Sequence, residues 1–464
     1  MLFSSVTFLF YFLPVVLALY YLMPRTWGKN IILFAAGMVF YAWGAGLLIA
    51  LLLLIGFITW LSGWLIVRSR LRKLMAVAGV AVLIAVLFYY KYLGFLIDSL
   101  NLLGVSELPR LKILLPAGVS FFIFQAISYI VDVYRKNARH EKNPVYVILY
   151  ISMFPQLLSG PLVRYHQLKD SLHARSFDPD LMSSGVRRFI IGLSKKVLLA
   201  DPLGLLADQI LHSEWSMAGP SVAWIGIIAF TLQLYFDFSG YTDMAVGTGR
   251  MLGFRLPENF NFPYISRSIS EFWRRWHMSL SGWLNEYLFT PLSLSFRRMR
   301  KAGVFLALMI TFTLCGIWHE PGWNFLIWGA MHGLFLGAEQ WFLKSFIQKI
   351  KIFGIIYALL IVILSFVFVF TDHPAQAMDY FGLMFGMNGK GTLGPLNFTG
   401  PHHLTLLLLG VFFCIPWHET KVFRSERFRK AKEVLSVCAI VVLLLLSAMA
   451  VTTQTYNPFL YFKF

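Results

Sequence analysis

Long apolar stretches alternate with short polar and basic ones along this chain. The first 24 residues carry no charge, and residues 30–67 form a second charge-free stretch. A helix needs about 20 apolar residues to cross the hydrocarbon core of a membrane. The second stretch is therefore long enough for two crossings, and we expect Gly44 and Gly46 to mark the break between them. The first stretch lacks a basic leader and a small-residue cleavage site, so we expect a retained helix rather than a signal peptide.

The same pattern continues to the end of the chain and predicts about eleven crossings. Further apolar runs predict spans near residues 74–93, 113–134, 219–238, 303–318, 324–343, 352–371, 402–417 and 434–452. Shorter or interrupted runs at 145–162 and 186–207 predict re-entrant or interfacial segments. The fold class is thus an all-α polytopic membrane protein. We expect one membrane domain over residues 1–464, with N-terminal spans at 1–134, a catalytic core with re-entrant and amphipathic segments at 135–345, and C-terminal spans at 346–464.

Composition agrees with the hydropathy pattern. Of the 464 residues, 58% are hydrophobic and only 13% are charged, and the mean hydropathy is +0.68. Soluble domains typically contain about 25% charged residues. A soluble enzyme, a disordered chain and a fibrous protein are therefore excluded. The three cysteines lie in or beside apolar stretches, which predicts neither a disulfide framework nor a zinc site.

The net charge of +18 is best explained by membrane topology rather than by nucleic-acid binding. Basic residues concentrate in loops on the cytoplasmic side of membrane proteins. The basic loops at 68–73, 135–142 and 421–432 are therefore expected inside, with the N-terminus and the C-terminal tail outside. Two ends on one side require an even number of crossings. One of the eleven is then miscounted, or a middle segment is re-entrant.

The sequence becomes unusually polar between residues 235 and 333, and His319 is the first candidate for chemistry there. Ionisable side chains at membrane depth are costly and mark functional sites. Pro321 follows the apolar run that ends at His319, so the helix is expected to end at this histidine. Broken helices at membrane depth line protein interiors or water-filled cavities. The alternative is a hydrogen-bonded histidine in an interfacial turn, with Trp318 and Trp323 as anchors.

His277 is the second candidate. If the segment is one helix, Arg274, His277 and Ser281 share a face. One interpretation is a basic amphipathic helix on the cytoplasmic surface, with Arg267, Arg274 and Arg275 on anionic lipid headgroups. The other is a polar helix that lines the mouth of a channel for an anionic donor. The spacing alone favours the first interpretation.

The remaining polar residues of this region have structural interpretations. His332 lies among apolar residues, where a hydrogen-bonded core histidine is the commoner situation. Asp237 and Asp243 are expected to pair with arginines and hold the helices together. None of these groups has the spacing of metal ligands. An imidazole, whose ordinary pKa is near 6.5, is suited to act as general base on a hydroxyl.

Several long segments, in one order along nearly the whole chain, resemble the membrane-bound O-acyltransferase family. The resemblance is strongest to its bacterial branch that serves alginate O-acetylation. The segments are LPAGVSFFIFQAISYIVDVYR at 115–135, MFPQLLSGPLVRY at 153–165, YFDFSGYTDMAVG at 235–247, FRLPENFNFPYISRSISEFWRRWHMSLSGWL at 254–284, GIWHEPGWNFLIWGAMHG at 316–333 and YNPFLYFKF at 456–464.

The resemblance implies a fold and a reaction. The fold is a ring of helices around a thin centre pierced by a tunnel. His319 matches the essential histidine of the family, and His277 matches its second functional position. No cofactor or metal is bound. The donor is a thioester of coenzyme A or of an acyl carrier protein. The acyl group crosses the bacterial cytoplasmic (inner) membrane to an extracytoplasmic SGNH-type acetyltransferase partner that modifies the polysaccharide.

On this resemblance the tryptophans Trp318, Trp323 and Trp276 are expected to wall the tunnel. Further lining residues are Arg274, Ser281, Asn324 and His332, and the donor is expected to bind at Arg267 and Arg275 on the cytoplasmic side. Two segments depart from the family pattern. The chain has Glu-Pro-Gly-Trp at 320–323 in place of Gly-Ala-Asn-Trp, and Asn-Glu-Tyr at 285–287 in place of Arg-Asp-Tyr.

Acetyl transfer for an extracellular or cell-wall polysaccharide is the leading functional hypothesis, and others remain open. The same chemistry could deliver D-alanine from a carrier protein to teichoic acid. A non-enzymatic polysaccharide or ion transporter would use the histidines and aspartates as a proton relay. A scaffold that recruits an outer-face transferase would need neither histidine.

Overall fold

The computed structural model describes residues 1–464 except 106, 110, 112, 213–214, 216–217, 344–350, 388–399, 418–428 and 454–464. The described chain is helical and contains no strand. It divides into two compact units, the first formed by Met1–Phe189 with Tyr241–Glu258 and the second by Ile190–Gly240 with Asn259–Phe464. The chain passes from one unit to the other after Phe189, after Gly240 and after Glu258.

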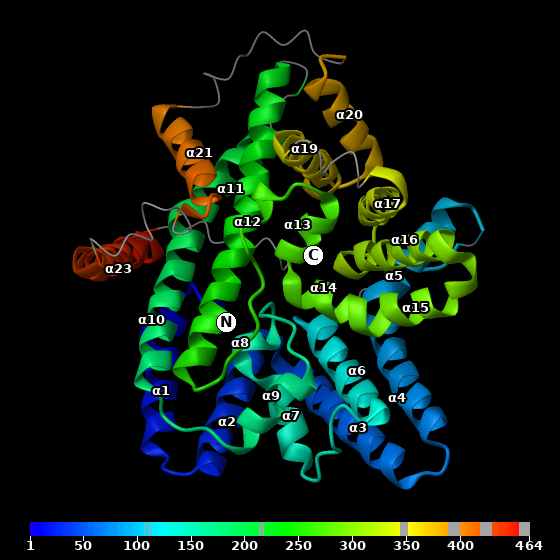
Figure 1. Cartoon of the computed structure of the whole chain (residues 1–464), viewed down its shortest axis with the longest axis vertical. Helices are drawn as coiled ribbons and strands as arrows, with labels where there is room; N and C mark the ends of the chain where they lie inside the picture. The colour runs from blue at the N-terminus through cyan, green and yellow to red at the C-terminus, as the bar shows by residue number, and fades with distance from the viewer. Residues whose placement is uncertain are drawn as a thin grey trace. The chain divides into compact units, whose positions relative to one another are not determined.

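The first unit contains the N-terminal helices (Figure 1). They are η1 (Phe8–Phe12), α1 (Leu13–Leu22), α2 (Thr26–Ala45), η2 (Gly46–Leu48), α3 (Ile49–Arg68), α4 (Arg72–Leu87), η3 (Phe88–Tyr92), α5 (Leu93–Leu102), α6 (Val119–Arg135), α7 (Pro144–Ser152), α8 (Phe154–Leu157), α9 (Tyr165–His173) and most of α10 (Pro179–Ser194).

The second unit contains the polar middle of the chain and the helices that follow it. They are η4 (Lys195–Ala200), α11 (Asp201–Leu211), most of α12 (Pro220–Met251), η5 (Pro263–Ile265), α13 (Ile269–Arg275), α14 (Met278–Leu284), η6 (Asn285–Phe289), α15 (Thr290–Ser295), η7 (Arg297–Met299), α16 (Arg300–His319), α17 (Trp323–Ala338), η8 (Glu339–Leu343), α19 (Lys351–Phe370), α20 (Pro374–Met384), α21 (Pro401–Phe413) and α23 (Arg429–Thr453).

Apolar helices cover part of the set of about eleven membrane spans that the sequence predicts. Six helical segments of the described chain are long and apolar enough to cross a membrane, and Phe8–Leu22 and Pro401–Phe413 are shorter apolar helices. The predicted break between the second and third spans is confirmed at Gly46, whose φ of 53° is accessible to glycine at little cost. The interruption expected within 145–162 is the gap between α7 and α8. The basic loop at 421–428 and the tail at 456–464 lie outside the described residues.

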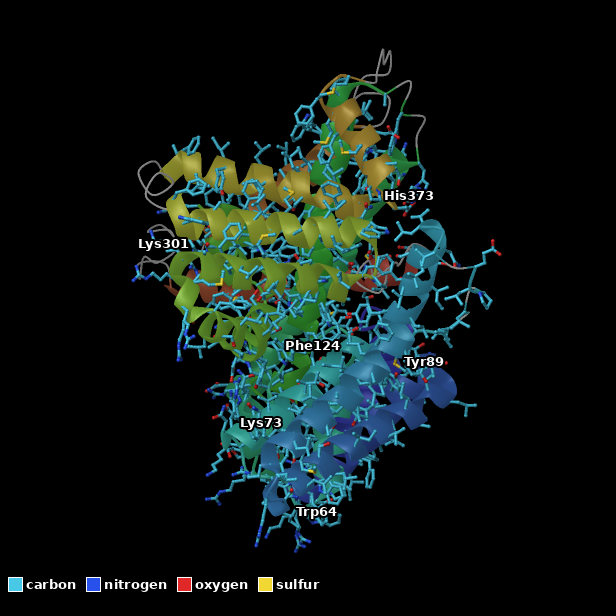
Figure 2. All side chains as sticks on the ribbon, turned by 90° about the vertical axis from the view of Figure 1, so that its right-hand side faces the viewer. Trp64, Lys73, Tyr89, Phe124, Lys301 and His373 are labelled. Atoms are coloured by element: carbon cyan, nitrogen blue, oxygen red, sulfur yellow. The ribbon has the colours of Figure 1, made fainter. Side chains whose placement is uncertain are left out.

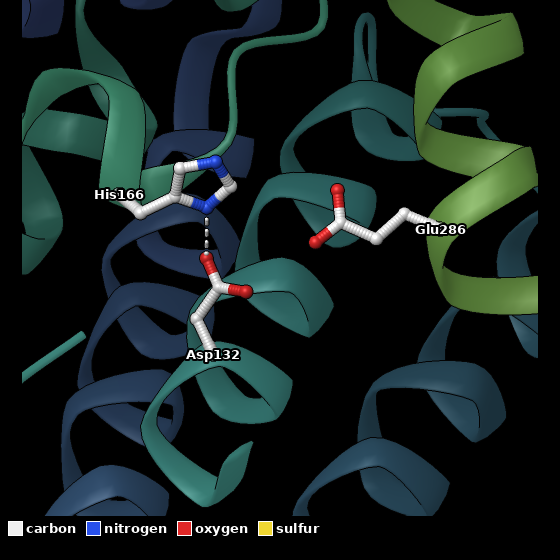
Figure 3. Close-up of side chains that lie close together, drawn as sticks. All are labelled: Asp132, His166 and Glu286. Carbon is white, nitrogen blue, oxygen red and sulfur yellow. Dashed lines mark hydrogen bonds and ion pairs between the residues drawn. The ribbon is translucent and has the colours of Figure 1, made fainter. Parts of the chain in front are cut away.

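Two polar side-chain contacts connect helices inside the first unit. The guanidinium of Arg188 on α10 donates to Asp243 on α12, with 2.8 Å between Nε and Oδ1, and it also contacts Glu258. Asp243 therefore has the arginine partner that was predicted. On α6 the buried carboxylate of Asp132 lies 2.8 Å from Nδ1 of His166. Figure 3 shows the two side chains with this contact as a dashed line.

The second unit contains a buried charge cluster, Lys196–Asp201–Asp237. The ammonium of Lys196 lies 2.6 Å from Oδ1 of Asp201 and 2.7 Å from Oδ1 of Asp237, and all three side chains are at most 3% exposed. The partner of Asp237 is thus a lysine rather than the predicted arginine. Burial of an ion without a partner costs several kcal/mol. The cluster therefore fixes η4 and α11 against α12.

Candidate active site

His277 lies at a break between two short helices, not on the face of one helix. Helix α13 ends at Arg275, and His277 is the N-cap of α14 with φ 44° and ψ 52°. The expectation that Arg274, His277 and Ser281 share a helix face is therefore wrong. A left-handed backbone conformation is uncommon for residues other than glycine. It persists only where the surrounding structure imposes it.

Asn259 holds this break. Its Oδ1 accepts hydrogen bonds from the backbone N–H of Ser279 (3.1 Å) and from the Ser279 hydroxyl (2.9 Å), and its carbonyl accepts from the Met278 N–H (2.9 Å). The same Oδ1 lies 3.0 Å from Nδ1 of His277. Because the oxygen can only accept, Nδ1 carries the proton and the lone pair of the neutral ring is on Nε2.

Burial keeps His277 neutral. The side chain is fully buried, and desolvation lowers its pKa well below the usual value, with a further lowering by His319. The segment 252–296 lies between the candidate membrane spans. A neutral imidazole has a ring nitrogen with the lone pair that a base or a hydrogen-bond acceptor needs.

Helix α13 is fixed at its start by a carboxylate from another helix. Ser268 caps α13 by accepting from the Glu271 N–H (3.0 Å). The buried carboxylate of Glu339 on η8 accepts from the N–H groups of Ile269 (2.6 Å) and Ser270 (2.8 Å). Two acceptors at one helix start satisfy backbone donors that would otherwise be buried without partners.

His319 is the last residue of α16, which confirms the predicted helix end. Glu320 is extended with φ −145° and ψ 134°, and Pro321 follows. The imidazole is 8% exposed and lies between the rings of Trp318 and Trp328, at centroid distances of 4.9 and 5.3 Å. Its ring centroid lies 6.4 Å from that of His277. The structure therefore brings together the two histidines that the sequence singled out.

Close contact between α16 and α17 places Trp328 beside His319. Gly316 and Gly329 face each other across the two helices, which lie side by side in Figure 1. A Cβ at Gly316 would overlap the carbonyl oxygen of Phe325, and one at Gly329 would overlap that of Phe312. Small residues of this kind allow helix backbones in membranes to approach closely.

His332 has a partner on each ring nitrogen. Trp273 Nε1–H donates to its Nδ1 at 3.2 Å, and its Nε2 lies 3.0 Å from Ser365 Oγ. The Ser365 hydroxyl donates to the Val362 carbonyl (2.8 Å), so Nε2 of His332 donates to the serine. These bonds link α13, α17 and α19 through one neutral histidine.

The other predicted site residues differ in their exposure. Trp318 and Trp276 are buried, whereas Trp323 is 44% exposed. Asn324 is buried and donates to the Thr371 carbonyl (2.7 Å). Ser281 donates to the Trp276 carbonyl (3.4 Å).

The arginines predicted to bind the donor also differ from one another. Arg267 and Arg274 are exposed. Arg275 is paired with Glu271 at 2.9 Å and also donates to the Asn261 carbonyl. Two of the three cations thus point to the surface, while the third is held within the unit.

Sequence reasoning missed Asn259, Glu339 and Lys196. Lys196 could have been found, because it interrupts the apolar run at 186–207 and a charge there marks a special position. Asn259 and Glu339 lie 18 and 62 residues from His277, and no local spacing connects them with it.

Comparisons with known proteins place most of the chain in one protein family. Residues 82–372 match the model of MBOAT, the membrane-bound O-acyltransferase family. The chain is 37% identical to a probable alginate O-acetylase AlgI of Azotobacter vinelandii and 36% identical to one of Pseudomonas putida, each over 100% of both chains. It is 31% identical to a teichoic acid D-alanyltransferase of Bacillus subtilis, over 49% of this chain and 59% of the relative.

Proposed function

Because the chain belongs to the membrane-bound O-acyltransferase family, we propose that it moves an acetyl group from a cytoplasmic thioester across the inner membrane. The acetyl group serves O-acetylation of an extracellular or cell-wall polysaccharide of the alginate type. The observation that carries this proposal is the pair of buried imidazoles, His277 and His319, 6.4 Å apart between ring centroids. Full-length similarity to alginate O-acetylases supports the substrate class.

The reaction exchanges a thioester for an ester. His319 takes the proton of the acceptor hydroxyl while the hydroxyl oxygen attacks the thioester carbonyl. The C–O bond forms, the C–S bond breaks, and the proton passes from His319 to the leaving thiolate. We place the reacting group beside the two rings, whose centroids are 6.4 Å apart. His277 accepts a hydrogen bond at Nε2 from the hydroxyl or the thiol and so assists the proton transfer.

Aromatic side chains exclude water from this reaction. The rings of Trp318 and Trp328 flank His319, and Phe238 stands edge-on to His277 at 4.7 Å. A thioester in a wet site would be lost to hydrolysis, and exclusion of water prevents that side reaction. We place Trp276 in the same wall on the basis of its burial.

The proposal also includes a binding surface for the acyl donor and a partner protein. Arg267 and Arg274 are exposed cations near the segment that carries His277, and they suit the phosphates of coenzyme A or an acidic carrier protein. An extracytoplasmic SGNH-type transferase is the proposed partner that receives the acetyl group or directs it to the polymer. No bound cofactor or metal takes part in the proposed steps.

A reconstituted transfer assay tests the proposal. Purified protein in proteoliposomes is given radiolabelled acetyl-coenzyme A, acetyl carrier protein or D-alanyl carrier protein on one face, with an oligosaccharide acceptor and the partner on the other. We expect acetyl label on the acceptor across the sealed membrane. Transfer of D-alanine alone would replace the proposed donor with the teichoic acid reaction. Transport of the oligosaccharide without consumption of any thioester would reject an acyltransferase.

Replacing Asn259 with alanine is expected to lower kcat by about 100-fold, because a small displacement of a catalytic group can cost this factor. The change removes Oδ1 of Asn259, which accepts hydrogen bonds from Nδ1 of His277 and from the backbone N–H and hydroxyl of Ser279. The assay is the same proteoliposome reaction, with Asn137→Ala, at an exposed position, as control. An unchanged kcat in folded Asn259→Ala would show that the position of His277 does not matter.

A further inference from the structure

The connection between α3 and α4 carries a concentrated positive charge. Arg68 is the last residue of α3, and Arg70, Arg72 and Lys73 follow within five residues. No acidic residue occurs in the sequence before Asp98, so these cations have no carboxylate nearby in the chain. Arg68 stacks on the ring of Trp64 at 4.6 Å. The other three cations remain available to a ligand.

These three cations line a pocket of about 720 Å³, which we term the basic pocket. Its lining residues are Arg70, Leu71, Arg72, Lys73, Leu74, Val77 and Tyr134. The lining contains no carboxylate, and Tyr134 comes from the neighbouring helix α6. Nε of Arg72 is buried and has no hydrogen-bond partner among the described residues. The basic pocket therefore offers donors and positive charge to an anion.

The other part of the lining is apolar and continues along α4. Leu74 and Val77 are 55% and 56% exposed, and Val82 and Ile84 further along the helix are 46% and 51% exposed. Lys73 and Tyr89 mark the two ends of this stretch in Figure 2. Since α4 begins a segment apolar enough to span a membrane, this exposed surface is suited to contact with lipid chains. The cations lie at the N-terminal end of this apolar segment.

We propose that the basic pocket binds an anionic phospholipid, with its phosphate on Arg70, Arg72 and Lys73 and an acyl chain along Leu74 and Val77. A pocket with cations at one end and exposed apolar side chains at the other matches a molecule with a phosphate and a chain. Basic pockets between membrane helices on the cytoplasmic side bind such headgroups. A soluble phosphate compound would make no use of the apolar end.

The test compares lipids and variants. Native mass spectrometry of the purified protein measures the binding of phosphatidylglycerol and of phosphatidylcholine. The pocket variant is Arg70→Gln/Arg72→Gln/Lys73→Gln. The control is Arg297→Gln/Arg298→Gln/Lys301→Gln, which removes the same charge at the start of α16. We expect phosphatidylglycerol to bind the pocket variant about 100-fold more weakly and the control as strongly as wild type. Equal weakening in both would show a general charge effect and overturn the proposal.

Two further arms use the wild-type protein, so they do not depend on how the variant folds. Photoactivatable phosphatidylglycerol is expected to label peptides that contain residues 70–77 or Tyr134. Labelling elsewhere would reject the basic pocket as the site. Inorganic phosphate and coenzyme A are added as competitors at millimolar concentration. If either displaces phosphatidylglycerol, the pocket is a site for a soluble phosphate and the lipid assignment is wrong.

Discussion

Replacing His319 with alanine is expected to abolish acyl transfer, with kcat at least about 1,000-fold below wild type. General acid–base catalysis by one side chain contributes a factor of about 10² to 10⁴. His319 is the last residue of α16, and its loss leaves the helix end at Glu320 and Pro321 in place. The protein should therefore still insert and fold. The measurement is release of thiol and of labelled ester in the proteoliposome assay.

The matched control for this variant is His212→Ala, which removes an exposed histidine at the end of α11. We expect it to retain the wild-type rate. Equal elution volume and thermal stability of the two variants would separate loss of chemistry from loss of fold. A folded His319→Ala protein with wild-type turnover would sink the assignment of the general base.

Replacing Gly316 with valine is expected to prevent α16 and α17 from forming their close contact and to eliminate most activity. A Cβ at this position would overlap the Phe325 carbonyl and approach Cα of Gly329 to 3.0 Å. Backbone atoms cannot move aside as a flexible side chain can, so the helices must separate. Overpacking of this kind costs about 1–3 kcal/mol or more. Because His319 lies three residues further along α16, its position between Trp318 and Trp328 is lost as well.

The thermal unfolding temperature of detergent-purified protein measures this effect. Gly322→Ala is the control, because Gly322 is extended and a Cβ there meets no atom within 4 Å in the described chain. We expect the unfolding midpoint of Gly316→Val to be lower than that of the wild type, and the midpoint of Gly322→Ala to be unchanged. Equal midpoints and equal activities would show that the glycine contact contributes nothing to stability.

Features set by local chemistry could be predicted from the sequence. Pro321 removes a backbone donor and restricts the residue before it, so the end of α16 at His319 follows from sequence alone. The break at Gly46 follows in the same way from the freedom of glycine to adopt positive φ. The apolar spans follow from length and composition. In each case the determining residues are neighbours in the chain.

The conformation of His277 could not be predicted, because its determinants are distant. The segment Arg274–Ser281 has ordinary helical spacing, and the local pattern favours one continuous helix. The acceptor that stabilises the break is the Asn259 side chain, with 3.0 Å to His277 Nδ1. The proximity of His277 to His319 arises only when α13, α14 and α16 fold together. The resemblance to a family identified both residues, but it gave no reason for their geometry.

The buried cluster of Lys196, Asp201 and Asp237 has a consequence for how the sequence can drift. Loss of the lysine alone leaves two carboxylates facing each other, while loss of one aspartate alone leaves a balanced pair. The three positions are therefore unequal in their tolerance. Loss of one acid leaves a lysine–aspartate pair, whereas loss of the lysine, or of both acids, leaves a buried charge without its partner. Among single substitutions in this cluster, replacement of Lys196 therefore costs more stability than replacement of either aspartate.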